Sequence, residues 1–157
     1  MLEPMAPFFH ASALAGDDVR LALPIIQVTR PGTTMTSWLE FSAYFDIGDE
    51  NRAGILALRD AADVICGVVA YRIEHGLQEA RQFSAHLFTA VDLSNSLRTV
   101  QLLLDVITAH ARQLQCRSLQ IRVDPRQTEL ADRMPILGMT ASGILFGKPV
   151  ELTVLPQ

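Results

Sequence analysis

The fold is decided by the stretch Phe83-Ser-Ala-His-Leu-Phe-Thr-Ala-Val-Asp-Leu93 and by the segment Leu97 to Gln115 that follows it. The first stretch has the composition of a β-strand. The second places apolar residues at helical spacing, which predicts a long helix packed on a sheet; they are Leu97, Val100, Leu103, Leu104, Ile107, Ala111 and Leu114. Ser118 to Val123 is predicted to be a further strand. We therefore expect a right-handed parallel crossover.

The junction between this strand and this helix lacks glycine, as does the whole segment from Leu77 to Leu137. Only Ser94-Asn95-Ser96 separates the two elements, and Asn95 or Ser96 is expected to cap the helix. In coenzyme-binding α/β proteins a glycine-rich loop here brings backbone N–H groups against a diphosphate. Without glycine, close backbone approach and positive φ are costly. The sequence therefore predicts the strand–helix arrangement of a phosphate-binding enzyme without the glycine-rich loop that binds the phosphate.

Composition favours one globular domain. The chain has 157 residues, of which 49% are hydrophobic, and we expect a domain over residues 17–157 preceded by a loosely attached arm over 1–16. The net charge of −4 and the scattered arginines argue against a nucleic-acid or anionic membrane surface. No apolar run reaches the ~20 residues of a membrane helix, and the N-terminus lacks a basic leader. A cytoplasmic location is expected.

The remaining elements complete an α+β fold. We predict two N-terminal helices, the first capped by Asp17 or Asp18 and the second starting at Thr36 or Ser37. The other predicted elements are an antiparallel strand pair, a short helix and a closing hairpin; they cover 53–59 with 64–73, 128–134, and 139–146 with 150–154. The expected architecture is a mixed, mostly antiparallel sheet with a central parallel strand pair and flanking helices.

This order of elements resembles the GNAT superfamily of acyl-CoA-dependent N-acetyltransferases, especially bacterial members. Local sequence agrees in several places: Leu23-Pro-Ile-Ile-Gln-Val-Thr-Arg-Pro31, Thr36-Ser-Trp-Leu-Glu-Phe41, Gly67-Val-Val-Ala-Tyr-Arg-Ile73, Ala109-His-Ala-Arg-Gln-Leu-Gln-Cys-Arg-Ser-Leu-Gln-Ile121 and Leu137-Gly-Met-Thr140. The resemblance spans roughly residues 18–150. It implies an acetyl-CoA or other acyl-CoA co-substrate and no metal.

The chain departs from the family pattern in two places. Members usually carry Arg/Gln-x-x-Gly-x-Gly/Ala before the coenzyme helix, and the corresponding stretch here, Asp92 to Val100, has no glycine. Many members also use a tyrosine as the acid that protonates the departing thiolate. Its position here is Met134, which cannot donate that proton. The resemblance therefore implies a degenerate coenzyme site.

The resemblance also assigns candidate site residues. Asp92 is the proposed catalytic base. Backbone groups of Val91 and Leu93 would align the pantetheine arm of the coenzyme by strand-like pairing. Ser96 and Arg98, at the start of the helix, would hold its anionic part. The aromatic residues of the second helix are expected to be packing residues, and some of them would border the acceptor cleft.

The other polar residues are interpreted as structural. His86 is placed on the same strand face as Asp92, but six residues of strand separate them by about 20 Å, so they cannot form an acid–base pair. His86 is expected to be half-buried, and His110 to contact solvent or a helix neighbour. Cys66 and Cys116 are interpreted as packing residues. No metal-ligand spacing or hydrolase triad is found.

Three functions remain open from the sequence. The first is acyl-CoA-dependent acyl transfer to a small-molecule or peptide amine, with activity weakened or lost. The second is a non-catalytic regulatory or protein-interaction module on an acetyltransferase scaffold. The third is a small-ligand sensor with an unrelated α+β fold, which would lack the parallel strand pair around the long helix. A homodimer is expected; nucleic-acid and membrane partners are not.

Overall fold

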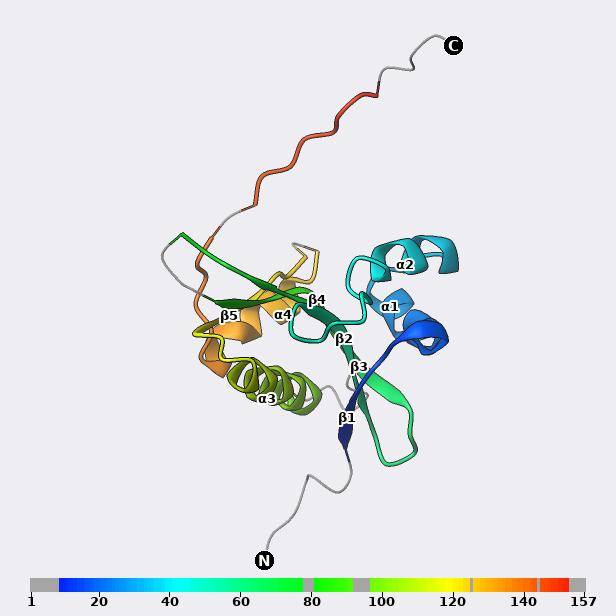
Figure 1. Ribbon diagram of the computed structural model, residues 1–157, viewed down its shortest axis with the longest axis horizontal. Helices are drawn as coiled ribbons and strands as arrows, with labels where there is room; N and C mark the ends of the chain where they lie inside the picture. The colour runs from blue at the N-terminus through cyan, green and yellow to red at the C-terminus, as the bar shows by residue number, and fades with distance from the viewer. Residues whose placement is uncertain (1–8, 78–80, 92–96, 125, 144, 153–157) are drawn as a thin grey trace, which may run out of the picture.

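The computed structural model describes residues 9–77, 81–91, 97–124, 126–143 and 145–152. Figure 1 shows a twisted sheet between two helical layers. In chain order the elements are β1 (His10–Ala13), the 3-10 helix η2 (Gly16–Ala22), α1 (Leu23–Thr29), α2 (Met35–Ser42), β2 (Ala53–Arg59), β3 (Ile65–Glu74), β4 (Gln82–Ala90), α3 (Arg98–Gln113), β5 (Ser118–Ile121), α4 (Thr128–Arg133) and the 3-10 helix η3 (Met134–Leu137).

The sheet has the strand order β1-β2-β3-β4-β5. Neighbouring strands are antiparallel except β4 and β5, which run parallel and are joined through α3. This pair confirms the predicted crossover and excludes the alternative fold that would lack it. Strand β1 was not predicted; it pairs with β2 from His10↔Arg59 to Ala13↔Leu56, so this part of the expected arm belongs to the sheet.

The two faces of the sheet carry separate apolar clusters, because side chains of a strand alternate between faces. Helix α3 covers one face. Its cluster contains Leu56, Leu58, Val69, Tyr71, Phe83, Ala85, Phe88, Val100, Leu103, Leu104, Ile107, Ala111 and Met134. The layer of η2, α1 and α2 covers the other, with Val19, Ile25, Ile26, Trp38, Phe45, Ile55, Ala57, Val68, Ala70 and Leu87. The central strands β2, β3 and β4 are therefore buried on both sides over most of their length.

Strand β4 contains one extra residue, His86. The β3–β4 register runs through Ala70↔Leu87 and then Tyr71↔Ala85, so His86 is a β-bulge. Before the bulge Phe83 and Ala85 face α3, and after it Phe88 does. The bulge therefore interrupts the alternation of side chains along β4, and Asp92, which was expected on the same face as His86, lies outside the described residues.

The N-terminal layer differs in detail from the prediction. Pro24 lies in the first turn of α1, where its missing N–H is tolerated, and the preceding turn is a 3-10 helix. Neither Asp17 nor Asp18 caps this region; both lie in the first turn of η2. Helix α2 is capped by Thr34, whose hydroxyl accepts the backbone N–H of Ser37 in a capping box, so this helix starts earlier than expected.

The predicted C-terminal hairpin is not formed in the part of the tail that the structure describes. Residues 139–143 and 145–152 contain no strand, and residues 145–152 run away from the domain (Figure 1). Alternation and the turn-like Gly147-Lys-Pro149 are local signals. They specify a strand only where a partner edge receives it.

Candidate functional site

The site begins where β4 and β5 separate. Their parallel pairing covers only Gln82↔Ser118 to Ala85↔Ile121, with one further hydrogen bond from the Arg122 N–H to the Ala85 carbonyl. Strand β4 continues to Ala90. The described chain therefore leaves the outer edge of β4 beyond the bulge without a paired strand. Such an edge can accept an extended ligand through backbone hydrogen bonds.

The ladder decides which backbone groups face this open edge. The N–H of Val91 donates to the carbonyl of Cys66 on the β3 side. In an antiparallel ladder successive residues point their backbone groups to opposite sides, so those of Phe88 and Ala90 point toward the open edge. The structure therefore moves the edge-facing groups from Val91 to Phe88 and Ala90. Leu93, Asp92 and Ser96 lie outside the described residues.

A carboxylate–imidazole pair lies beside this edge. Nε2 of His86, at the bulge, is 2.6 Å from Oε1 of Glu74 at the end of β3. The His86 side chain is 23% exposed and that of Glu74 is 42% exposed, so solvent reaches both. If neutral His86 donates its Nε2 proton to Glu74, Nδ1 remains as the nitrogen that can accept a proton. Sequence reasoning missed Glu74, which lies twelve residues before His86 in the chain.

Phe45 and Arg72 support the pair from the α1–α2 side. The ring of Phe45 is 5.6 Å from that of His86, and the guanidinium of Arg72 lies over the Phe45 ring at 5.6 Å. Arg72 also donates to the carbonyl of Tyr44. Of the aromatic residues around the second helix, Phe45 contacts the pair, whereas Trp38 is buried and donates its indole N–H to the carbonyl of Val19.

Both members of the pair line an open groove of about 640 Å³. One wall is polar and comes from β3 and β4, with Glu74, Ser84 and His86; the opposite wall follows β5 and the η3 helix. The η3 wall includes Met134, which is 8% exposed. The predicted substitution of a proton donor by methionine therefore concerns a residue that does lie on the groove.

The helix start carries a cation but no side-chain cap. Leu97 is the N-cap of α3 and makes no capping hydrogen bond. The expected cap by Asn95 or Ser96 lies outside the described residues. Arg98 is the first residue of the helix, and its guanidinium is 5.3 Å from the Phe9 ring centroid. Arg98 is thus held at the helix end to which the resemblance assigns the anionic part of the coenzyme.

A charged cluster ties the N-terminal layer to the end of β5. Asp124 accepts two side-chain hydrogen bonds and one backbone hydrogen bond from Arg126, and Arg30 approaches the same carboxylate at 3.6 Å. These contacts hold the pKa of Asp124 well below its usual range, chiefly through the Arg126 side chain. The cluster links the end of α1 to the chain after β5.

His110 is half-buried and, beyond the expected contact with solvent or a helix neighbour, packs against Tyr71 and Phe83 of the α3-side cluster. Its Nε2 is 3.1 Å from the hydroxyl of Tyr71, which donates to the carbonyl of Glu50 at 2.8 Å. Because Tyr71 uses its proton there, His110 must donate from Nε2. Burial lowers the pKa of His110 and raises that of Tyr71 to about 12. This pair is structural.

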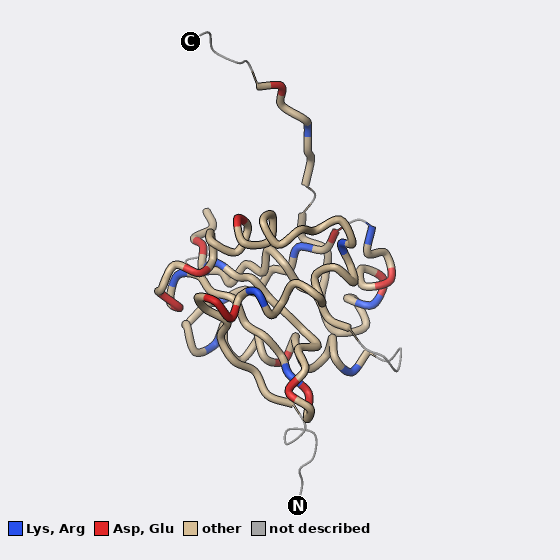
Figure 2. Tube along the Cα trace, turned by 90° about the vertical axis from the view of Figure 1, so that its right-hand side faces the viewer, with Lys and Arg blue, Asp and Glu red and all other residues tan. Residues whose placement is uncertain are grey.

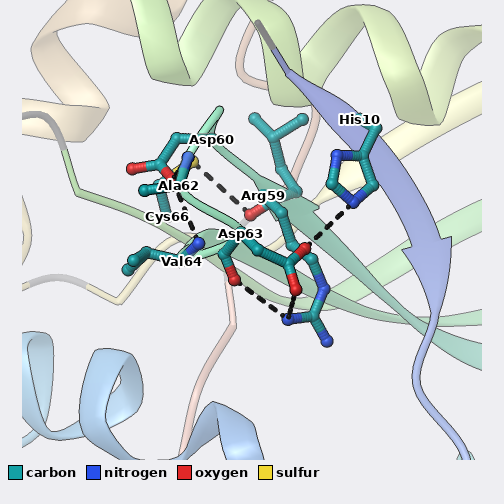
Figure 3. A network of polar contacts seen from close by, with 8 residues as sticks. His10, Arg59, Asp60, Ala62, Asp63, Val64 and Cys66 are labelled. Atoms are coloured by element: carbon teal, nitrogen blue, oxygen red, sulfur yellow. Dashed lines mark hydrogen bonds and ion pairs between the residues drawn. The ribbon is translucent and has the colours of Figure 1, made fainter.

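A second polar network stabilises the hairpin between β2 and β3, and it includes the exposed His10. Asp60 accepts the backbone N–H groups of Ala62 and Val64 between β2 and β3, and Asp63 lies near both His10 and Arg59 (Figure 3). The Cys66 thiol contacts the Leu58 carbonyl. Neither Cys66 nor Cys116 forms a disulfide, and both pack against the α3-side cluster. This network stabilises a turn distant from β5 in the strand order.

The described residues contain no group of three His, Cys, Asp or Glu side chains placed to hold a metal ion. None of the described helices is long and apolar enough to cross a membrane. Acidic and basic residues alternate around the described body rather than gathering on one side (Figure 2).

Comparison with known proteins shows similarity of fold only. No protein-family model and no curated sequence matches the chain. Among solved structures, a transcriptional regulator from Bacillus halodurans C-125 superposes with a TM-score of 0.74 at 11% identity, covering 90% of this chain and 99% of that one. Aminoglycoside N-acetyltransferase AAC(6')-Iy, in complex with CoA, gives 0.71 at 15% identity, over 90% and 94%. Glucosamine-6-phosphate N-acetyltransferase from Arabidopsis thaliana gives 0.64 at 11%, over 91% and 99%.

The chain has the GNAT fold. Within the GNAT fold, the separation of β4 from β5, the bulge at His86 and the start of α3 are the features that position the candidate site. At these levels of identity the neighbours carry no residue roles to this chain.

Proposed function

We propose that this protein is an acyl-CoA-dependent N-acyltransferase with a weakened hold on the coenzyme. One observation carries the proposal: an open strand edge and a carboxylate–imidazole pair adjoin each other at the bulge of β4. The edge suits the two amides of a pantetheine arm, and the imidazole suits proton removal from an amine. AAC(6')-Iy binds CoA on the same fold, which supports the choice of donor.

Phe88 and Ala90 are proposed to hold the pantetheine arm, with their backbone groups as hydrogen-bond partners. Arg98 is proposed to meet the diphosphate, in place of the glycine-rich loop that the sequence lacks. The chain therefore offers more contacts to the thioester end of the coenzyme than to its diphosphate end. The thioester end has a strand edge to bind, while the diphosphate end depends on one exposed cation. Leu93 and Ser96 remain expectations from the resemblance, whereas the N–H of Val91 donates to the carbonyl of Cys66.

His86 is proposed to carry the proton transfers, with Glu74 as its positioning residue. The amine nitrogen attacks the thioester carbonyl carbon, a C–N bond forms, and the C–S bond breaks. Nδ1 of His86 takes the proton that the nitrogen loses. Because Met134 cannot serve as an acid, the resulting imidazolium returns this proton to the departing thiolate. The products are an amide and free coenzyme thiol. Asp92 stays a possible second base under the resemblance.

The acceptor is proposed to be a primary amine on a small molecule or peptide. The groove is open, and its polar wall offers Glu74 and Ser84 to a cationic or hydroxyl-bearing ligand. The names of neighbouring structures point to amino sugars: an aminoglycoside and glucosamine 6-phosphate. These two compounds and a lysine-containing peptide are therefore the first acceptors to test.

The test is direct detection of the acylated amine. The full chain is incubated with acetyl-CoA and each acceptor, and the product is measured by mass spectrometry, so that the native thiols do not interfere. Acetylated product that disappears in a His86→Ala variant supports the proposal. Product formed equally well by the variant would contradict the role of His86.

A non-catalytic role on the same scaffold is the second candidate, and the buried thioether of Met134 on the groove wall favours it. In that case the protein would bind a partner through the groove without turnover. Binding of acetyl-CoA without product for any acceptor in the panel would favour this candidate over the enzyme.

A further inference from the structure

The face of the sheet that carries the carboxylate–imidazole pair continues onto β5 as a row of polar side chains. Phe83 and Ala85 point toward α3, so Ser84 between them points to the opposite face. The parallel ladder pairs Ser84 with Gln120, and paired residues of neighbouring strands point to the same face. Gln120 therefore extends the polar surface of Ser84 onto β5.

Arg122 is the next residue of β5's chain to share this face. It follows Gln120 by two residues, and its backbone N–H donates to the carbonyl of Ala85 at 2.9 Å, so the strand-like pairing still holds at this position. Arg122 lines the same groove as Glu74 and His86. Because neighbouring strands lie about 4.8 Å apart, the end of β5 brings a guanidinium to the groove beside the proposed base.

The charge of Arg122 is not used by the part of the chain that the structure describes. Arg122 is exposed and makes no ion pair with another described residue. The carboxylate two residues further along, that of Asp124, is already held by Arg126 and Arg30. Arg72, which shares this face on β3, instead lies over an aromatic ring and donates to a backbone carbonyl. Arg122 is therefore available to an anionic ligand.

The groove thus contains opposite charges that do not neutralise each other. Glu74 and Arg122 both line it, and no ion pair joins them. A separated carboxylate and guanidinium are complementary to a ligand that carries both an ammonium and an anion. The planar fork of the guanidinium matches a carboxylate or a phosphate group. The volume of about 640 Å³ is large enough for an amino acid or an amino sugar.

We propose that Arg122 determines acceptor specificity by binding an anionic group of the amine. The acceptor class is then a primary amine that also carries a carboxylate or a phosphate. This inference rests on the proposed function, because it assumes that the amine is held beside His86. Arg122 binds the acceptor before and during the reaction alike, so its contribution falls mainly on KM rather than on kcat.

The first test compares acceptors that differ only in the anionic group. The pairs are glucosamine 6-phosphate with glucosamine, and leucine with leucinamide; acetylated product is measured by mass spectrometry. We expect the parent to prefer the anionic member of at least one pair by about tenfold or more in kcat/KM. The preferred pair shows whether the anion is a phosphate or a carboxylate. Equal kcat/KM within both pairs would overturn the proposal.

Variants then locate the preference. Arg122→Ala should remove it, because the KM of the anionic member rises by about tenfold or more while its kcat changes less. Arg122→Lys keeps the charge without the fork and should restore part of the preference. Arg117→Ala removes another exposed arginine, just before β5, and should retain the parent's preference. A preference that survives in Arg122→Ala would overturn the role of Arg122.

The second test measures binding without chemistry. The same four compounds are titrated calorimetrically into the full chain with free coenzyme A present, so that no acyl group can be transferred. Tighter binding of an anionic member, lost in Arg122→Ala, supports the anion site even where no acetylated product forms, a result that would reject the acyltransferase alone. Acetylated product without any preference for an anion would reject the role of Arg122 and leave the proposed function in place.

Discussion

The imidazole of His86 lies 2.6 Å from the carboxylate of Glu74 because β4 carries one extra residue. The bulge places His86 on the face that Glu74 occupies at the end of β3, within ring contact of Phe45. It also coincides with the point at which β5 leaves β4, since the pairing of these strands ends at Ala85↔Ile121. One irregularity of the backbone therefore positions the imidazole that we propose as the base beside an open strand edge.

Removing this base should lower acyl transfer far more than it lowers stability. We expect His86→Ala to reduce kcat by about 10² or more, the range of general acid–base contributions. The control is His75→Ala, which removes an exposed histidine one residue from Glu74. Initial rates of product formation, followed by mass spectrometry, provide the measurement. Similar losses in both variants would show that the imidazole of His86 has no special role.

Glu74→Gln tests whether the carboxylate acts through His86. The amide keeps the size of the side chain but removes the charge that favours the Nε2–H tautomer. A positioning role predicts a fall in kcat of about tenfold with little change in KM. A rise in KM at constant kcat would instead place Glu74 in direct contact with the acceptor amine.

His110 should make stability depend on pH. Burial lowers its pKa from the usual 6.5, so the folded protein takes up this proton less readily than the unfolded chain. The free energy of unfolding is therefore highest above about pH 6.5 and falls as the pH drops toward the lowered value. His110→Gln retains an N–H for Tyr71 and should lose less Tm than the parent between about pH 7.5 and about pH 5. His75→Gln should behave like the parent.

Alanine substitutions at two glycines should have opposite effects on the free energy of unfolding. A Cβ at Gly54 would lie 2.8 Å from the hydroxyl oxygen of Tyr71, and this ring is held by Glu50, His110 and its stack on Phe83. Gly54→Ala should lower the free energy of unfolding by about 1–3 kcal/mol. At Gly32 a Cβ would meet nothing within 4 Å, so Gly32→Ala should be neutral or stabilising by up to about 1 kcal/mol. Chemical denaturation of both variants provides the comparison.

Arg98 should contribute to coenzyme binding only through charge. We expect Arg98→Ala to weaken acetyl-CoA binding by up to about tenfold, the size of one exposed charge contact. Arg112→Ala removes an arginine from the last turn of the same helix and should have no effect. Calorimetric titration of the two variants tests the location of the anionic end of the ligand. Equal affinities would place it elsewhere.

The crossover of β4, α3 and β5 could be predicted because each element has a long periodic pattern of its own. The bulge could not be predicted, because alternation along Phe83–Ala90 gives no sign of one inserted residue. Glu74 was missed for the same reason: its contact with His86 depends on the register of two strands, which is a tertiary property.

The ends of the domain were also beyond local patterns. Strand β1 consists of four exposed residues without an apolar pattern of their own. They form a strand because they pair with the edge of β2. The C-terminal hairpin was predicted from alternating apolar and polar residues, but the described residues of the tail form no strand. The contacts predicted for Leu93 and Ser96 lie outside the described residues. The selection of Phe88 and Ala90 as edge-facing residues depends on the Val91–Cys66 hydrogen bond, which local sequence does not show.

The central claim is that the open edge of β4 holds the thioester arm of an acyl donor while the diphosphate adds little. The direct measurement is calorimetric titration of the full chain with acetyl-CoA and, in parallel, with S-acetylpantetheine, which lacks the diphosphate. The account predicts that both bind, with dissociation constants within about tenfold of each other. Absence of binding by both, or acetyl-CoA binding more than about 100-fold tighter, would contradict it.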